Sequence, residues 1–201
     1  MADHPVRSAR PSATRRVFGV DPGTRVVGWA VLTQGEDRGI AVVSGTWRLG
    51  GSEVPVPVRL LRLHELLKAV LHLHKPTELA IEAAFLGQNV RSALRLGEAR
   101  GVVMMAAAAS GLQVEEIPPA TVKRRVAGAG AASKEQLERL VRMRLGQPDL
   151  LFASSDESDA VAIALCALLA GDGRAAGVPV SAGTRSRRAR AALPAGARIQ
   201  Q

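Results

Sequence analysis

Residues 15–32 of the chain read RRVFGVDPGTRVVGWAVL, and this stretch decides how the fold is interpreted. Valine and phenylalanine favour a half-buried strand over residues 17–21, and Pro22-Gly23 turns the chain into a second strand at residues 26–32. Side chains alternate along a strand, so Asp21 shares a face with Val17 and places a carboxylate at the end of an apolar strand. An Asp-Pro-Gly turn whose aspartate binds backbone amides is the ordinary alternative.

The sequence after this stretch predicts a mixed sheet with helices. A strand within residues 39–47 completes three antiparallel strands, and further strands are predicted at 78–82 and 112–117. Apolar periodicity and capping residues predict helices at 58–74, 90–110, 118–126, 134–145 and 154–170. Three antiparallel strands followed by alternating helices and parallel strands predict an α/β fold with helices on both faces of the sheet.

The composition divides the chain into a folded domain and two basic ends. The chain has 201 residues and a net charge of +9, and most of that charge comes from arginines near the two termini. The ends have few large apolar residues. We therefore expect a disordered basic extension at 1–16, a folded domain at 17–170 and a disordered arginine-rich tail at 171–201. Basic ends of this kind favour a polyanionic partner.

Simple residue counts exclude some classes of protein. The chain contains no tyrosine, so it cannot be an enzyme that attacks DNA with a tyrosine hydroxyl. Cys166 is the one cysteine, so no intrachain disulfide can form, which suits a reducing compartment and predicts a cytoplasmic location. No apolar run is long enough to predict a membrane span, so we expect no membrane partner.

Carboxylates end two predicted strands and begin the last predicted helix. Asp21 ends the first strand, Glu82 ends LAIE, and Asp156 and Asp159 lie in the first turn of SSDESDAVAIALCALL. Each has an ordinary explanation, because first-turn aspartates suit the helix dipole and a strand-end glutamate is usually solvated. If both strands are central and the helix crosses their ends, the carboxylates converge. Hard oxygen ligands suit Mg²⁺ or Mn²⁺, and two such ions can activate water for phosphodiester cleavage.

Four blocks of the sequence resemble the RuvC family of bacterial Holliday junction resolvases. They are FGVDPGTRVVGWAVL, LAIEAAFLGQNVRSALRLGEARG, PPATVKRRVAGAGAASKEQL and SDESDAVAIALCALL, in the family's order. The resemblance implies a ribonuclease H-like fold, a homodimer, and a Mg²⁺-dependent crossover junction endodeoxyribonuclease. Such an enzyme nicks four-way DNA junctions symmetrically during recombination and repair, leaving 5′-phosphate and 3′-hydroxyl ends. The resemblance also implies the branch-migration proteins RuvA and RuvB as partners.

The resemblance also implies roles for single residues. The family's four metal ligands fall on Asp21, Glu82, Asp156 and Asp159, which would hold two Mg²⁺ ions, with Mn²⁺ as a substitute. Phe85 matches an aromatic residue that would stack on an unpaired base at the crossover, although a packed residue at the helix entry is the alternative.

Basic residues complete the predicted DNA interface. Lys123 and Lys134 match positions that the family places near the scissile phosphate, and lysine is rare in this arginine-rich chain; two solvated lysines are the alternative. We also expect phosphate contacts from four arginines, which could equally be solvated: Arg91, Arg95, Arg124 and Arg125. Gln88 departs from the family, because many members have a basic residue there.

Other classes of protein fit the sequence less well. GVDPGT resembles the phosphate turn of actin- and sugar-kinase-type ATPases, but these pair two such domains and this chain has room for one. DDE transposases order their acids differently, and a small relative acting on RNA has no reason for the loop with Phe85. A catalytically silent junction-binding protein is the strongest alternative. The four acidic positions argue against it, because DNA binding does not reward carboxylates that face phosphates.

Overall fold

Five strands form a single sheet at the centre of the computed structural model, which describes residues 14–35, 37, 39–83 and 90–171. The strands lie in the order β3-β2-β1-β4-β5. Pairing is antiparallel between β1 and β2 and between β2 and β3, whereas β4 runs parallel to both β1 and β5. The bounds are β1 Arg16–Asp21, β2 Val26–Gln34, β3 Ile40–Arg48, β4 Glu78–Glu82 and β5 Gln113–Ile117.

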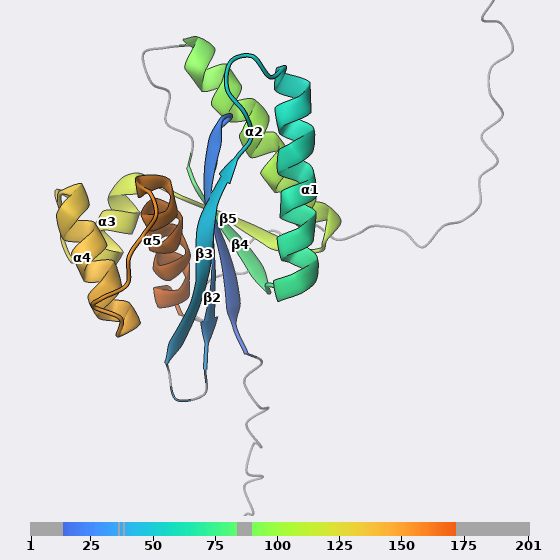
Figure 1. The fold of residues 1–201 in the computed structure, drawn as a ribbon. Coiled ribbons are helices and arrows are strands. Elements are labelled where there is room, and N and C mark those ends of the chain that lie inside the picture. The colour runs from blue at the N-terminus through green and yellow to red at the C-terminus, as the bar shows by residue number, and fades with distance from the viewer. Residues whose placement is uncertain (1–13, 36, 38, 84–89, 172–201) are drawn as a thin grey trace, which may run out of the picture.

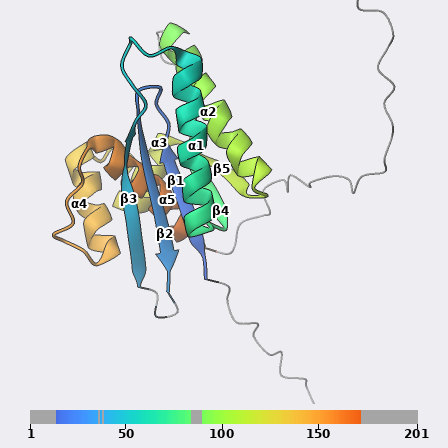
Figure 2. The same ribbon diagram turned by 45° about the vertical axis from the view of Figure 1, so that its right-hand side comes forward.

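Helices cover both faces of this sheet. Figures 1 and 2 show α1 and α2 on one face and α3, α4 and α5 on the other. The bounds are α1 Val56–His74, α2 Val90–Ala109, α3 Pro119–Ala127, α4 Lys134–Leu145 and α5 Ser155–Leu169. The predicted α/β class, with antiparallel strands first and parallel strands later, is therefore confirmed.

Alternation along the central strands divides the apolar residues into two cores. In β1, Phe18 and Val20 pack with α1 and α2, whereas Val17 packs with α3, α4 and α5. In β4, Ala80 belongs to the same core as Val17. Residues two apart on a strand share a face, so Asp21 and Glu82, at the ends of β1 and β4, are on the face that α5 covers.

Helix α5 lies unusually close to the sheet. After a polar first turn it is buried along almost its whole length, including Cys166. A Cβ atom on Gly19 of β1 would lie 2.4 Å from the carbonyl oxygen of Ala160 and 2.7 Å from the Cβ of Ala164. Only a glycine at that position lets the helix backbone approach the strand this closely.

The predicted elements agree with the structure to within a few residues. Helix α1 begins at Val56 and not at residue 58, and includes Pro57. Proline fits the first turn of a helix because the N–H group it lacks has no partner within the helix there. Among the described residues, no helix combines the length and apolar character needed to cross a membrane.

Candidate active site

Asp21 and Glu82 come together at the ends of two adjacent parallel strands. Val20 pairs with Ile81 in the β1–β4 register, so Asp21 and Glu82 are the next residues along the two strands. Both side chains are half-buried. From the sequence it could only be assumed that both strands are central in the sheet. In the structure β1 and β4 are adjacent and central, so the two carboxylates lie side by side.

The first turn of α5 is held against the same end of the sheet. Gly28 pairs with Asp21 across the β1–β2 ladder. A Cβ atom on Gly28 would lie 1.8 Å from the carbonyl oxygen of Asp156, so the helix backbone passes directly over this glycine. This contact brings Asp156 and Asp159, which share one side of the first helical turn, to the strand ends that carry the other two carboxylates.

The negative charges of the other three carboxylates affect the pKa of Asp21. Burial raises the pKa of Asp21 from 3.8 to about 7, and the negative charges of Asp159, Glu82 and Asp156 add to this effect. Lys134 opposes the shift. A carboxylate surrounded in this way is stabilised by a nearby positive charge, which an ammonium group or a metal ion can supply.

Glu82 is held by a buried arginine from α2. Burial raises the pKa of Glu82, as does the charge of Asp159, while Arg100 and Lys134 act to lower it. Arg100 is buried; its guanidinium donates to the backbone carbonyl of Glu82 and forms an ion pair with Glu116 at 2.5 Å. Arg100 therefore fixes the end of β4 and supplies a positive charge behind the site.

Lys134 reaches the carboxylates from the first turn of α4. Its Nζ atom donates to Oδ2 of Asp159 at 2.7 Å. Burial acts to lower the pKa of Lys134, but the hydrogen bond and charge of Asp159, together with Asp21 and Asp156, raise it above its usual value. Ser133 sets the start of α4 through a capping box with Gln136, and so fixes the point from which Lys134 extends.

The donor chemistry of this cluster fits a hard divalent cation. All four side chains offer carboxylate oxygens, which Mg²⁺ and Mn²⁺ prefer, and after burial the charges of the other three carboxylates contribute to the raised pKa of Asp21. In the described part of the chain, no three acidic, histidine or cysteine side chains are close enough to enclose an ion as they stand.

Two adjoining hollows open on either side of Glu82. One, of about 230 Å³, is lined by Glu82 and Asp159 together with Lys123 and Lys134. The other, of about 120 Å³, is lined by Asp21, Glu82 and Arg100 among others. Both lysines predicted from the resemblance thus lie beside the carboxylates, which leaves room for a phosphate between acidic and basic groups.

The other residues that were predicted to contact DNA lie outside the described residues or elsewhere in the structure. Phe85 and Gln88 lie outside the described residues, as does the side chain of Arg91. Arg124 is exposed on α3 and donates to Thr121 at 3.5 Å. Arg125 points to α5 instead, where its guanidinium donates to the carbonyl of Cys166 at 3.1 Å, so it ties α3 to α5. One guanidinium nitrogen of Arg125 is thus engaged within the protein, and a phosphate contact from this partly buried residue stays a prediction.

Three residues that position the site were not predicted. Gly28 and Arg100 are two of them; the signals were a glycine inside an apolar strand and an arginine on the buried stripe of a helix. The third is Glu157, a buried side chain that accepts hydrogen bonds from Oγ of Ser44 and from the backbone N–H of Ala153, each at 2.7 Å. Its spacing from Ser154 matches a capping box, which was the available signal.

Comparison with known proteins assigns the chain to a family. The model of the family described as crossover junction endodeoxyribonuclease RuvC matches residues 17–167. The chain belongs to the RuvC family. A RuvC of Myxococcus xanthus is 42% identical over 178 residues, covering 89% of this chain and 92% of that protein. A RuvC of Dehalococcoides mccartyi is 38% identical over 151 residues, covering 75% and 90%.

A solved RuvC structure has the same fold. The RuvC of T. thermophilus in complex with Holliday junction substrate superposes with a TM-score of 0.71 at 30% identity, covering 78% of this chain and 94% of that one. The ribonuclease H-like fold and the RuvC resemblance predicted from the sequence are thus confirmed. The family match over residues 17–167 includes all four carboxylates.

Proposed function

We propose that this chain is a metal-dependent endonuclease that resolves four-way DNA junctions. The observation that carries the proposal is the meeting of Asp21 and Glu82, on adjacent strand ends, with Asp156 and Asp159 from α5, in a member of the RuvC family. Symmetrical phosphodiester hydrolysis by two copies would leave 5′-phosphate and 3′-hydroxyl ends, as recombination and repair require.

The four carboxylates would hold two Mg²⁺ ions, with Mn²⁺ as a substitute. When bound, such ions activate water and stabilise charge on the scissile phosphate. Asp21, a half-buried carboxylate that is influenced by the charges of the other three, would hold the ions together with them. No protein nucleophile is required, which is consistent with the absence of tyrosine from the chain.

The two lysines would bind and orient the scissile phosphate. Lys134 and Lys123 line the hollow that also contains Glu82 and Asp159. A compact ammonium group suits a site where positive charge must be delivered to one phosphate oxygen. Lys134 donates to Asp159, and we propose that its ammonium group would turn from this carboxylate to the phosphate when a strand enters.

A labelled four-way junction tests this activity. In Mg²⁺ we expect paired nicks at symmetry-related positions, no nicks in EDTA, and none on a linear duplex of the same arm sequence. The rival is a junction-binding protein without activity. Tight binding without nicks, in Mg²⁺ and in Mn²⁺ and over several junction sequences, would establish that rival and contradict the nuclease.

We further propose that two copies associate through an open face of α2. Val90, Leu94, Gly97, Gly101 and Met105 recur at helical spacing, and the three large side chains are 72%, 65% and 52% exposed. A Cβ atom on either glycine would meet nothing within 4 Å, so a second backbone can approach there. A dimer would present two active sites to the two strands that must be cut.

The other parts of the chain extend this proposal. Phe85 would stack on a base unpaired at the crossover, and the domain at 17–170 would act within the cytoplasm alongside RuvA and RuvB. The arginine-rich segments at 1–16 and 171–201 would add non-specific affinity for DNA through counterion release. Deleting both should flatten the salt dependence of binding, and an unchanged dependence would exclude that role.

A further inference from the structure

A third hollow, rich in arginine, adjoins the carboxylates on the side away from the lysines. It has a volume of about 520 Å³. Three elements supply its walls: the turn between β1 and β2, the first turn of α1 and the beginning of α2. Its lining residues are Thr24, Arg25, Arg59, Ser92, Arg95 and Leu96.

Shared residues fix the order of the three hollows. The lysine hollow and the Asp21 hollow share Glu82 and Pro119. The Asp21 hollow and the arginine hollow share Leu96, whereas the lysine and arginine hollows have no lining residue in common. The carboxylates therefore lie in the middle, with lysines on one side and arginines on the other. A strand of DNA whose scissile phosphate lies at the carboxylates can extend in both directions.

The three arginines have different roles. Arg59 is 7% exposed, and its NH1 donates to the carbonyl of Thr24 at 2.8 Å, while its buried Nε has no partner among the described residues. It thus holds the turn and adds a buried positive charge. Arg25 is exposed on that turn. Arg95 forms an ion pair with Glu98 at 3.1 Å in which both side chains are about 40% exposed, so the pair is weak and a phosphate can replace it.

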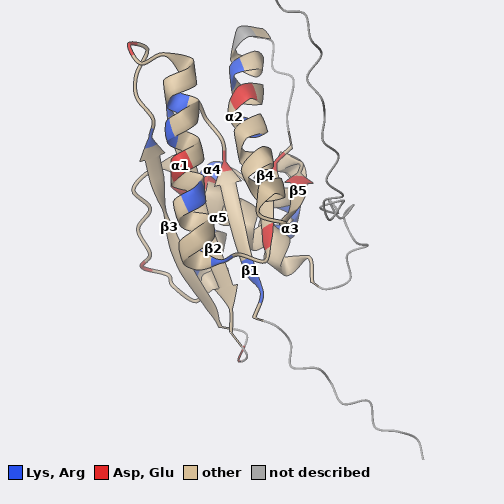
Figure 3. Cartoon of the chain, turned by 90° about the vertical axis from the view of Figure 1, so that its right-hand side faces the viewer, with Lys and Arg blue, Asp and Glu red and all other residues tan. Residues whose placement is uncertain are grey.

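The surroundings favour an anion. Neither α1 nor α2 has an acidic residue in its first turn, and both begin at this end of the sheet, where the positive ends of their dipoles lie. Figure 3 shows basic positions near the beginnings of both helices and an acidic position on α2. Two carboxylates are near, since Glu98 pairs with Arg95 and the pKa of Glu53 is lowered by backbone N–H groups and then by Arg25 and Arg59. Three arginines outweigh them.

We propose that the hollow lined by Arg25, Arg59 and Arg95 binds a backbone phosphate of the strand being cut, on the side of the scissile phosphate opposite to Lys123 and Lys134. This inference rests on the proposed junction nuclease activity. Arg25 and Arg95 supply the phosphate contacts, and Arg59 positions the turn that carries Arg25. The strand is then gripped on both sides of the carboxylates, which holds the scissile phosphate in place.

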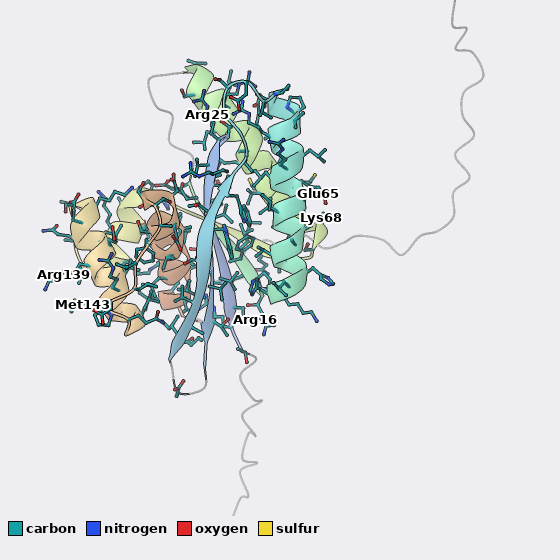
Figure 4. The ribbon with its side chains drawn as sticks, viewed as in Figure 1. Arg16, Arg25, Glu65, Lys68, Arg139 and Met143 are labelled. Atoms are coloured by element: carbon teal, nitrogen blue, oxygen red, sulfur yellow. The ribbon has the colours of Figure 1, made fainter. Side chains whose placement is uncertain are left out.

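Salt-dependent binding of the full-length protein to a labelled four-way junction in EDTA tests the contact. Arg25→Ala and Arg95→Ala should each weaken binding about tenfold and lower the slope of log affinity against log salt by about 1. Arg139→Ala is the matched control, because Arg139 is an exposed arginine on α4 and lies well away from Arg25 (Figure 4). It should leave the slope unchanged. Wild-type slopes for both Arg25→Ala and Arg95→Ala would overturn the proposal.

Single methylphosphonate substitutions locate the phosphate. A neutral linkage at one position on one side of the cleaved bond should weaken the wild type and have no further effect on Arg25→Ala. A neutral linkage on the other side of the cleaved bond should weaken binding by the wild type and have no further effect on Lys123→Ala. The assignment would be contradicted if a neutral linkage weakened Arg25→Ala as much as the wild type at every position. It would also be contradicted if the linkage that has no further effect on Arg25→Ala lay on the same side of the cleaved bond as the one that has no further effect on Lys123→Ala.

Nicking by the wild type in Mg²⁺, measured in parallel, separates this inference from the proposed activity. Normal nicking with unchanged slopes for the arginine variants overturns the arginine site alone. Lowered slopes without wild-type nicking support the phosphate contact and overturn the nuclease.

Discussion

The carbonyl oxygen of Asp156 lies where a side chain on Gly28 would begin: a Cβ atom there would be 1.8 Å from it. Gly28→Ala must therefore displace the first turn of α5 or the end of β2. We expect a loss of about 2–4 kcal/mol in the free energy of unfolding, and loss of nicking even where the protein remains folded, because Asp156 and Asp159 move with the turn. Urea denaturation and junction nicking measure the two effects.

Gly130→Ala is the matched control for that substitution. Gly130 lies in a turn after α3, where a Cβ atom would meet its nearest neighbour, the carbonyl of Ala120, at 3.8 Å. Alanine should leave stability unchanged or raise it by up to about 1 kcal/mol, and should leave nicking unchanged. Similar stability and activity for Gly28→Ala and Gly130→Ala would mean that the close approach of α5 does not position the site.

Asp21 should destabilise the metal-free protein at neutral and higher pH. Its folded-state pKa is raised from 3.8 to about 7, so between these values the folded state keeps a proton that the unfolded state has lost. Stability then falls as pH rises through this range and remains lower above it. Asp21→Asn should therefore stabilise the protein in EDTA by about 1–3 kcal/mol at pH 8, and by less at pH 5.

Urea denaturation at the two pH values measures this difference. Glu65→Gln, which changes an exposed carboxylate on α1 (Figure 4), should show the same stability as the wild type at both. Added Mg²⁺ should stabilise the wild type and have less effect on Asp21→Asn, since binding to the folded state raises its stability. If Asp21→Asn were less stable than the wild type at pH 8 in EDTA, ionised Asp21 would not destabilise the folded protein.

Glu157 should act through its two hydrogen bonds and not through contact with substrate. Glu157→Ala leaves Oγ of Ser44 and the N–H of Ala153 without their acceptor, and should cost about 1–3 kcal/mol of stability. Glu157→Gln retains an acceptor oxygen and should cost less. Mg²⁺ affinity, followed by calorimetry, should fall in the alanine variant and recover in the glutamine variant. Equal affinities in all three proteins would limit Glu157 to a purely structural role.

The proposed dimer predicts a change in mass on charge substitution. Leu94→Glu combined with Met105→Glu places two carboxylates on the open face of α2 and should convert the protein to a monomer in sedimentation equilibrium. Leu73→Glu is the control, because Leu73 is 74% exposed on α1. It should leave the mass unchanged. A wild-type mass for the double α2 variant would place the dimer interface elsewhere.

Much of the fold could be predicted because its signals are local. Pro22-Gly23 marks the first turn. Helical spacing predicted an apolar stripe in α1 of Leu60, Leu63, Leu67 and Leu71, of which Leu63 and Leu67 are buried and the other two partly buried. The start of α1 was misplaced because Pro57 was interpreted as ending a loop. The four carboxylates stood out because polar residues ended or began otherwise apolar elements, and the order of the strands then brought them together.

The supporting residues could not be predicted because their roles depend on contacts between distant parts of the chain. Arg100 acts on Glu82, and Glu157 accepts from Ser44, more than a hundred positions away. Arg125 shows the converse: its position in a basic stretch favoured DNA, but the packing of α3 on α5 directs its NH1 group to the carbonyl of Cys166. The arginine hollow likewise forms only when the β1–β2 turn meets two helices.

Nicking of a four-way junction by single amide variants of the four carboxylates tests the central claim most directly. Asp21→Asn, Glu82→Gln, Asp156→Asn and Asp159→Asn should each bind the junction as tightly as the wild type and nick it at least about a hundredfold more slowly in Mg²⁺. Glu65→Gln should nick normally. If the wild type nicks the junction and any one of the four variants does so at the same rate, the claim that these residues form one metal-dependent centre is wrong.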